Sequence, residues 1–356
     1  MSEEGGVSLK ENLLTYYDKL QCDPCCNSLL KQNFTKDVIE EIGNKVTNSG
    51  CTLSDCIKSG VENPDSSTGI YAADAESYTL FAPLFRPIIE KYHGSIKHPF
   101  VDFGNPETIN FANLDPTGEY IISTRIRVGR NVEGYPFTAT ISRDQQEALE
   151  TKIKEALTHF DGDLEGTYCP LPGMDDPTRD QLVEDHFLFQ QGDRFLQSAG
   201  GYRNWPHGRG IFFNKTKTFL IWINEEDHLR IISMEQGANF DSVYKRLMRG
   251  IKILEQHVSF YRDDELGYLT FCPTNLGTTI RASVHIKIPK LSSQPNFKEF
   301  CLGLNLQVRG THGEHTDTKG GVYDVSNKRR MGLTEIEVIR EMYNGITQII
   351  EKEKSL

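Results

Sequence analysis

Apolar and polar positions follow one period in the first part of the chain and another in the rest. Within residues 8–94, three segments carry apolar residues every three to four positions, which predicts amphipathic helices: LKENLLTYYDKL, TKDVIEEIGNKV and FAPLFRPIIEKYHG. Gly43 and Gly94 stand where helices tend to stop. The pattern predicts a helical N-terminal domain over residues 8–94.

A polar segment, SGVENPDSSTGIYAADAES, interrupts these helices at residues 59–77. It is too polar to be buried and too long for a plain turn. Long loops of this kind often carry functional residues, so we single it out as a candidate. The alternative is a mobile surface loop with an ordinary turn glycine.

Residues 95–118 contain three prolines and no helical period, which predicts a linker. From residue 119 the pattern changes to strands, expected at 119–129, 210–234, 266–273, 279–289 and 304–310. Helices are expected among them at 142–159, 177–191, 239–257 and 333–353. FFNKTKTFLI has the length of a hairpin. Helices grouped around consecutive strands predict an α+β domain with an antiparallel sheet over residues 119–356.

Strand alternation gathers basic side chains on one face of this sheet. In STRIRVGR it sets Arg125 and Arg127 opposite Ile126 and Val128. In EEDHLRII it aligns Glu226, His228 and Arg230. In IRASVHIKI it separates one polar set from one apolar set: Arg281, Ser283, His285 and Lys287 against Ala282, Val284, Ile286 and Ile288. LQVRGTHGEH then adds Arg309, followed by Glu314.

The polar face of any single strand is explained by solvation, because antiparallel sheets commonly face water on one side. Four strands bearing arginine are harder to explain in this way, since clustered guanidinium groups repel one another. Buried carboxylates, a phosphate or a nucleotide triphosphate could neutralise them. The chain has neither a GxxxxGK motif followed by Ser or Thr nor a GxGxxG that follows a strand. His186 and His285 could flank a base, although a single histidine is usually structural.

Acidic residues near Cys272 suggest a second ligand. A thiolate and carboxylates such as Glu226 and Glu314 suit a flat cation with several N–H donors, and a guanidinium fits that description. A cysteine near arginines can have a lowered pKa. The alternatives are a buried inert thiol and a Cys–His nucleophile, but no thioester or protease signature surrounds Cys272.

Overall charge and the first residues narrow the class of protein. The 356 residues carry 39 basic and 50 acidic side chains, a net charge of −11, which disfavours nucleic acid and anionic membranes as partners. No apolar run reaches the roughly 18 residues of a membrane span. The N-terminus shows no secretory signal, so a cytoplasmic protein with free thiols is expected. CDPCC (Cys22, Cys25, Cys26) imitates a metal or redox motif but lacks a second ligand pair.

Several motifs together resemble the phosphagen (ATP:guanidino) kinase family: CPTNLGTTIRASVHIKIPKL, STRIRVGR, NEEDHLRIISM, DHFLF, GRGIFFN, VRGTHGEH and SNKRRMGLTE. The likeness covers nearly the whole chain. It implies a small all-helical domain and a larger, glutamine-synthetase-like domain with about eight antiparallel strands flanked by helices. The implied reaction is reversible transfer of the γ-phosphoryl group of MgATP to a guanidino nitrogen, which buffers ATP, in a cytoplasmic monomer.

The resemblance also assigns roles to residues. It implies that Glu226, Cys272 and Glu314 hold the guanidinium, with Glu226, alone or with Glu314, as base or positioning group. Arg125, Arg127, Arg230, Arg281 and Arg309 would hold phosphates, and His186 and His285 would lie near the adenosine. The nucleotide-binding segments would comprise Ser123, Thr124, Arg125, Ile126 and Arg127; Arg281, Ala282, Ser283, Val284 and His285; and Arg309, Gly310, Thr311, His312, Gly313 and Glu314.

DSSTGIY, residues 65–71, matches the family's guanidino-specificity loop, in which a longer loop suits a smaller substrate. Its length and content resemble those of the arginine-specific members. Contacts to the amino acid are implied for Ser66, Ser67, Thr68, Gly69 and Tyr71, and a tie between the domains for Asp65 and Arg194. His312 replaces a usual arginine, and Thr68 a more often apolar residue.

Other substrates and functions are left open by the sequence. Taurocyamine, lombricine or creatine could replace arginine as the acceptor. A kinase for protein-bound arginine would not need the helical domain. A non-catalytic nucleotide-binding module would not need Glu226, Cys272 or Glu314.

Overall fold

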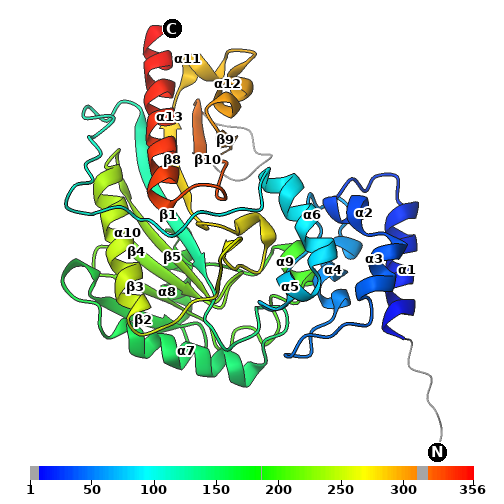
Figure 1. Cartoon of the computed structure of the whole chain (residues 1–356). Helices are drawn as coiled ribbons and strands as arrows, with labels where there is room; N and C mark the ends of the chain where they lie inside the picture. Colours follow the sequence, from blue (N-terminus) through cyan, green and yellow to red (C-terminus); the bar gives the residue numbers. More distant parts are fainter. Residues whose placement is uncertain (1–7, 186, 311–319) are drawn as a thin grey trace, which may run out of the picture.

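Helices build the N-terminal part of the computed structural model, which describes residues 8–185, 187–310 and 320–356 (Figure 1). The first of them begins with a capping box, in which the Ser8 hydroxyl accepts from the Glu11 N–H and the Glu11 carboxylate accepts from the Ser8 N–H. Gly94 ends the last in the left-handed conformation, at φ 73°. The helices are α1 (Leu9–Cys22), α2 (Leu29–Asn33), α3 (Lys36–Ile42), α4 (Leu53–Glu62), α5 (Ser77–Leu80) and α6 (Ala82–His93).

An eight-stranded, wholly antiparallel sheet forms the centre of the larger domain, in the order β2-β3-β4-β5-β1-β8-β10-β9. The α+β class and the antiparallel sheet are therefore confirmed. The strands are β1 (Ile121–Arg130), β2 (Gly166–Pro170), β3 (Gly210–Asn214), β4 (Phe219–Ile223), β5 (Leu229–Gln236), β8 (Arg281–Lys287), β9 (Leu306–Arg309) and β10 (Val322–Asn327). β6 (Arg262–Asp263) and β7 (Gly267–Tyr268) pair separately.

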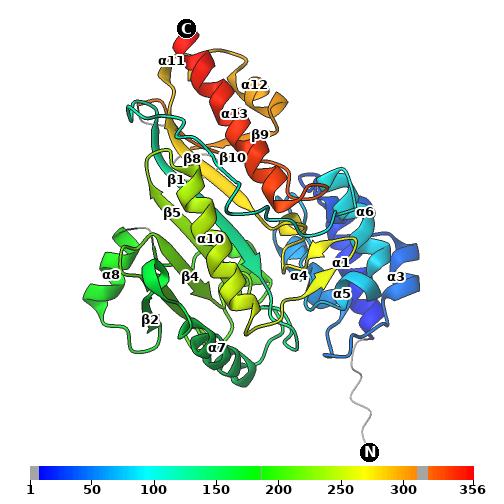
Figure 2. The same cartoon turned by 60° about the vertical axis from the view of Figure 1, so that its left-hand side comes forward.

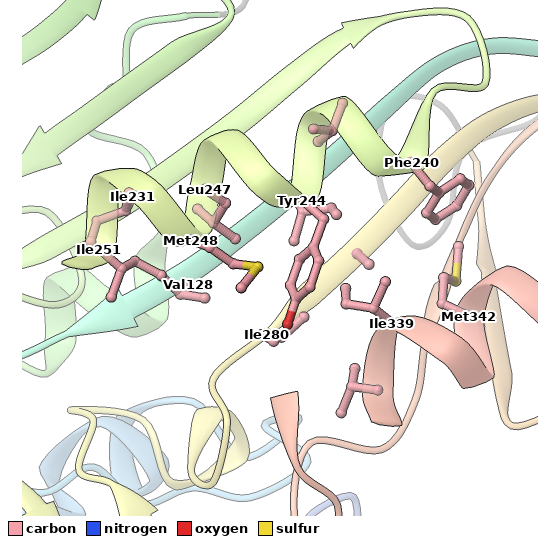
Figure 3. Close-up of a cluster of buried hydrophobic side chains, with 14 of the residues drawn as sticks. Val128, Ile231, Phe240, Tyr244, Leu247, Met248, Ile251, Ile280, Ile339 and Met342 are labelled. Carbon is pink, nitrogen blue, oxygen red and sulfur yellow. The ribbon is translucent and has the colours of Figure 1, made fainter. Parts of the chain in front are cut away.

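Long helices cover one face of the sheet (Figure 2). α10 crosses β5 and β1, and its residues Tyr244, Leu247 and Met248 pack with Val128 and Ile231 of these strands (Figure 3). The opposite face carries a smaller apolar cluster under α8 at its β3–β4 end and basic side chains along β1 and β8. The larger domain's helices are α7 (Arg143–Leu157), α8 (Asp176–Glu184), α9 (Arg194–Ser198), α10 (Phe240–Glu255), α11 (Pro289–Ser292), α12 (Phe297–Gly303) and α13 (Glu335–Ser355).

The apolar core of the helical domain extends into the larger domain, which also has a core of its own under the sheet. Phe81 and Phe85 of the helical domain pack in the same cluster as Phe137, Leu269 and Phe271 of the larger domain. Residues 95–118 contain no helix or strand, yet Ile109 and Phe111 are buried in the larger domain's core. The segment therefore lies packed against that domain along part of its length.

Two predicted elements are wrong in extent. The helix expected over 177–191 ends at Glu184, because the N–H groups of Phe187 and Leu188 turn back to the Leu182 carbonyl. The strand expected over 266–273 shrinks to β7, since Gly267 has φ 74° and the following residues pack between the domains. The β3–β4 hairpin is confirmed. Within the described residues, no helix combines the length and apolarity needed to cross a bilayer.

Candidate active site

Arginines from neighbouring strands meet on the face of the sheet away from α10. Arg127 of β1 lies directly opposite Arg281 of β8 in the ladder, while Ile126 and Val128 face the apolar core. Arg230 of β5 pairs in register with Gly129, two residues along β1 from Arg127. The predicted convergence of these basic side chains is therefore present in the structure. Arg127, Arg230 and Arg281 line one small pocket with Glu226.

Arg127 and its neighbour on the same face of β1, Arg125, form no ion pair within the part of the chain that the structure describes. Burial, together with the charges of Arg230 and Arg281, lowers the pKa of Arg125 to about 10. The same causes hold the pKa of Arg127 well below its ordinary value. A polyanion bound here would relieve this repulsion.

The other two arginines have acidic partners. Arg230 Nη2 lies 3.0 Å from Glu225 Oε2 and 2.7 Å from Glu226 Oε2. Arg281 Nη2 lies 2.5 Å from Asp324 Oδ2. Burial acts to lower the pKa of Arg230, but the neighbouring carboxylates outweigh it and raise the pKa. Partly buried carboxylates thus form ion pairs with Arg230 and Arg281, but not with Arg125 or Arg127.

Glu226 lies in the turn between β4 and β5. Its carbonyl accepts from the Thr138 hydroxyl at 2.7 Å, and its N–H donates to Glu225 Oε2 at 2.8 Å. Burial raises the pKa of Glu226 most strongly, Arg230 opposes this effect, and Glu225 adds to it, so the net shift is upward. A carboxylate with a raised pKa is a better proton acceptor near neutral pH than an exposed one.

Cys272 lies in the segment between β7 and β8, and 8% of its surface is exposed. Its Sγ lies 3.1 Å from Thr274 Oγ1. Burial and, to a lesser extent, the charge of Glu226 raise the pKa of the thiol to about 12. The expected lowering of this pKa by arginines is therefore wrong for the protein without substrate, because desolvation and a nearby carboxylate dominate. A bound guanidinium would act in the opposite direction.

The candidate specificity loop is held firmly against the helical domain. The carbonyls of Ser67 and Thr68 accept from the first N–H groups of α2, each at 2.9 Å, and Ser66 Oγ accepts from Gly69 N–H at 3.0 Å. Gly69 has φ 77°, and a methyl group on Gly60 of α4 would lie 2.1 Å from its carbonyl oxygen. The alternative of a mobile surface loop therefore does not fit this structure. Ser66, Thr68 and Gly69 are buried, whereas Ser67 is exposed.

Tyr71 connects this loop to the cysteine segment. Its ring stacks on that of Phe271, with centroids 4.7 Å apart and planes at 21°. The next residue, Ala72, donates its N–H to the Phe271 carbonyl at 2.8 Å. Burial raises the pKa of Tyr71 most strongly, and the charges of Cys272 and Glu226 add to this effect. The end of the loop is thus packed against the segment that carries Cys272.

Asp65 and Arg194 form the predicted contact between the domains. Arg194 donates through both terminal nitrogens to the Asp65 carboxylate, and its Nη1 also donates to Asn63 Oδ1 at 3.1 Å. Beside this pair, the Ser59 hydroxyl donates to the Phe195 carbonyl at 2.7 Å. The start of α9 is therefore joined to the end of α4.

Some predicted site residues face elsewhere. Four of them are buried on the core side of β1 and β8, so their side chains lie away from the arginines: Thr124, Ile126, Ala282 and Val284. His228 is also misplaced, because β5 begins one residue later, at Leu229. Its Nδ1 accepts from Val132 N–H at 2.9 Å, which makes it a fully buried structural residue.

The remaining predicted residues fall into two groups. Asp324 of β10 is in register with both His285 and Arg309, and Ser123 is opposite His285, so these residues share one part of the sheet with Ser283. Gly310 follows β9. The other group lies outside the described residues: His186, Thr311, His312, Gly313 and Glu314.

Sequence reasoning missed Arg330. Its Nη1 donates to the Thr274 carbonyl at 2.8 Å and to Asn275 Oδ1 at 2.6 Å, and it lines the same pocket as Arg127 and Glu226. Burial lowers the pKa of Arg330. The adjacent basic residues in SNKRRMGLTE could have indicated Arg330, but they lie outside the predicted strands, so alternation does not assign them to a face of the sheet.

A cationic sheet face with a partly buried carboxylate, a buried thiol and a loop that ends in a stacked tyrosine is the arrangement expected of a guanidino phosphotransferase. The chain belongs to the ATP:guanido phosphotransferase family: residues 24–90 match its N-terminal domain and residues 148–356 its C-terminal catalytic domain.

Named relatives lie close in sequence. Arginine kinase 1 of Drosophila melanogaster is 56% identical over 335 residues, which cover 92% of this chain and 94% of the relative. The arginine kinase of Penaeus japonicus is 52% identical over 355 residues, 98% of this chain and 99% of its own.

Solved structures show the same fold. The substrate-free duplicated taurocyamine kinase from Schistosoma mansoni superimposes with a TM-score of 0.92 at 46% identity. The match covers 96% of this chain and 49% of that one, so this chain spans about half of the duplicated protein. A lombricine kinase superimposes with a TM-score of 0.88 at 34% identity, covering 94% of this chain and 95% of its own.

Proposed function

We propose that this protein is an arginine kinase, which reversibly transfers the γ-phosphoryl group of ATP to a guanidino nitrogen of L-arginine. The observation that carries the proposal is the convergence of Arg127, Arg230 and Arg281 on one small pocket that Glu226 also lines. The arginine kinases at 52–56% identity over nearly the whole chain support arginine as the acceptor.

The proposed chemistry needs alignment more than covalent help. Phosphoryl transfer through a loose transition state leaves charge spread over the transferring group. Arg125, Arg127, Arg230 and Arg281, with Arg309 beyond them, would stabilise that charge. Holding both substrates in line supplies roughly 7–11 kcal/mol of barrier reduction. Magnesium would enter with the nucleotide as MgATP, held mainly by phosphate oxygens and water.

Glu226 is the proposed base or positioning group for the guanidinium. A free guanidinium titrates above pH ~12, so the attacking nitrogen needs a proton acceptor. Glu314 is proposed as its partner. Cys272 would contribute orientation and charge, with no covalent intermediate.

Location and assembly belong to the same proposal. All eight cysteines are free thiols, which is typical of a reducing compartment and supports a cytoplasmic location. A monomer is proposed from the family resemblance, and size-exclusion chromatography with light scattering would test it.

A substrate panel tests the proposed function. With MgATP in a coupled assay, L-arginine is expected to give the highest kcat/KM among arginine, taurocyamine, lombricine and creatine. The reason is the loop at residues 65–71, because its length and content resemble those of the arginine-specific members of the family. Preference for another compound would retain the phosphotransferase and reject arginine as its substrate. No ATP consumption with any guanidino compound would reject both.

Cys272→Ala is expected to reduce kcat by at most roughly 10²-fold, because Glu226 and the arginines remain to orient the substrates. Steady-state rates measure this effect, and mass spectrometry of the wild-type protein under turnover tests for an adduct. A phosphorylated Cys272, or complete loss of activity in a folded variant, would contradict the non-covalent role.

A further inference from the structure

Asn131, the residue that follows β1, lies between the two segments that carry Glu226 and Cys272. Only 1% of its surface is exposed. Its Nδ2 donates to Asp227 Oδ1 at 2.7 Å and to the Leu269 carbonyl at 3.1 Å. Its Oδ1 accepts from the His228 N–H at 2.9 Å. One buried amide is therefore bonded to both segments at once.

Asp227 strengthens this connection. The same Oδ1 that accepts from Asn131 also accepts from the Phe271 N–H at 2.8 Å. Asp227 directly follows Glu226, and Phe271 directly precedes Cys272. The three side-chain hydrogen bonds of Asn131 and the bond from Phe271 to Asp227 thus fix the backbone next to Glu226 and next to Cys272.

The amide is chemically suited to this position. A buried asparagine remains neutral and keeps its two donors and its acceptor at every working pH. Burial and the charge of Glu226 raise the pKa of Asp227 to about 7, so a second carboxyl group in place of Asn131 would add repulsion where a donor is needed. An aliphatic residue would leave the Leu269 carbonyl without the donor that Asn131 supplies, and Asp227 Oδ1 with the Phe271 N–H in place of two donors.

We propose that Asn131 is a positioning residue for phosphoryl transfer, which sets the distance between Glu226 and Cys272 by bonding the 226–228 turn to the 269–271 segment. The inference rests on the proposed function, because it concerns the geometry of that reaction. The Asn131 side chain bonds to Asp227, His228 and Leu269, none of which is proposed to bind a substrate. Its effect is expected in the chemical step, since small displacements of aligned groups have large kinetic effects.

Asn131→Ala is expected to lower kcat about 10- to 100-fold and to change the KM for ATP less than threefold, because the arginine face is left intact. Asn131→Ser keeps one donor and one acceptor, so its kcat should fall between those of the wild type and Asn131→Ala. The assay uses whichever guanidino compound the wild-type protein phosphorylates. Asn131→Ser also provides the test if the alanine variant does not fold.

Asn214→Ala is the matched control. Asn214 is likewise fully buried and bonds through its side chain to the backbone, but it lies at the far end of the β3–β4 hairpin from the Glu226 turn. The Asn214→Ala variant is expected to lose thermal stability while its kcat remains that of the wild type. A purely structural Asn131 would behave in the same way as Asn214.

The outcomes separate the positioning role of Asn131 from the proposed kinase function. A wild-type kcat in the folded Asn131 variants would overturn the positioning role and leave the proposed function intact. A rise in the KM for ATP equal to the fall in kcat would instead place the effect in the nucleotide site and also overturn it. A wild-type protein inactive on every guanidino compound would overturn both.

Discussion

Replacing Glu226 with glutamine is expected to lower kcat by at least ~10²-fold while the protein stays folded. The substitution preserves the shape of the side chain but removes the proton acceptor. It also removes one of the two charges that face Arg230 Nη2, although Glu225 remains 3.0 Å from that nitrogen. Steady-state assays with saturating substrates measure the loss of kcat.

Glu225→Gln is the control for Glu226→Gln. Both carboxylates contact Arg230, so either change removes one negative charge beside that guanidinium. If Glu226 acts on the substrate, its variant should lose far more activity than the Glu225 variant. Equal losses would mean that both residues serve only to neutralise Arg230, and near-normal turnover of Glu226→Gln would remove it from the mechanism.

The pH profile gives a second readout for Glu226. Because its pKa is raised, the carboxylate form is lost as the pH falls through that pKa, and kcat should decline on the acid side. Glutamine does not titrate, so this acid limb should disappear from the small residual activity. A limb unchanged in the variant would belong to another group.

Arg281→Ala is expected to reduce kcat/KM by roughly 10²–10³-fold, through loss of transition-state charge stabilisation. Arg281 lies opposite Arg127 in the β1–β8 ladder and contacts Asp324 of the next strand. Its removal leaves the partly buried Asp324 carboxylate without its ion-pair partner, which adds a stability cost. Rates and thermal melting together separate these two effects.

Arg246→Ala provides the matched comparison. The Arg246 side chain is 11% exposed and pairs with Glu235 at 2.7 Å, and the Arg281 side chain is 10% exposed and pairs with Asp324 at 2.5 Å. Arg246 belongs to α10 and takes no part in the pocket with Arg127. Both variants should lose stability, but only Arg281→Ala should lose kcat/KM beyond a few-fold. Similar kinetics in the two would show that Arg281 is structural.

Strand alternation predicted the faces of β1 and β8 correctly, because both are internal strands with one wholly buried side. Arg127 and Val128 therefore separate as a period of two requires. The same reasoning failed for His228, where the chain is still in a turn that contains Asn224 at φ 57°. A period of two has no meaning before the strand begins.

Contacts distant in sequence could not be predicted from local patterns. β2 is an edge strand with partly exposed residues, so it carries no strong alternation. The Asn131 bonds join residues about 100 and 140 positions apart, and nothing near Asn131 in the sequence indicates them. The arginine cluster was visible because each strand displays its own member, whereas Arg330 follows a strand that was not predicted.

The close approach of Gly60 and Gly69 restricts how the choice of acceptor could change during evolution. A methyl group on Gly60 would meet the backbone of Gly69, and one on Gly69 would meet the Leu30 side chain, so neither glycine accepts even a methyl group without displacement. Extra residues inserted into the loop have no space on the helix side and would have to extend outward. Under the specificity role proposed for this loop, new substrate sizes would therefore arise more readily from insertions and deletions between residues 65 and 71 than from exchanges of side chains at the point of contact.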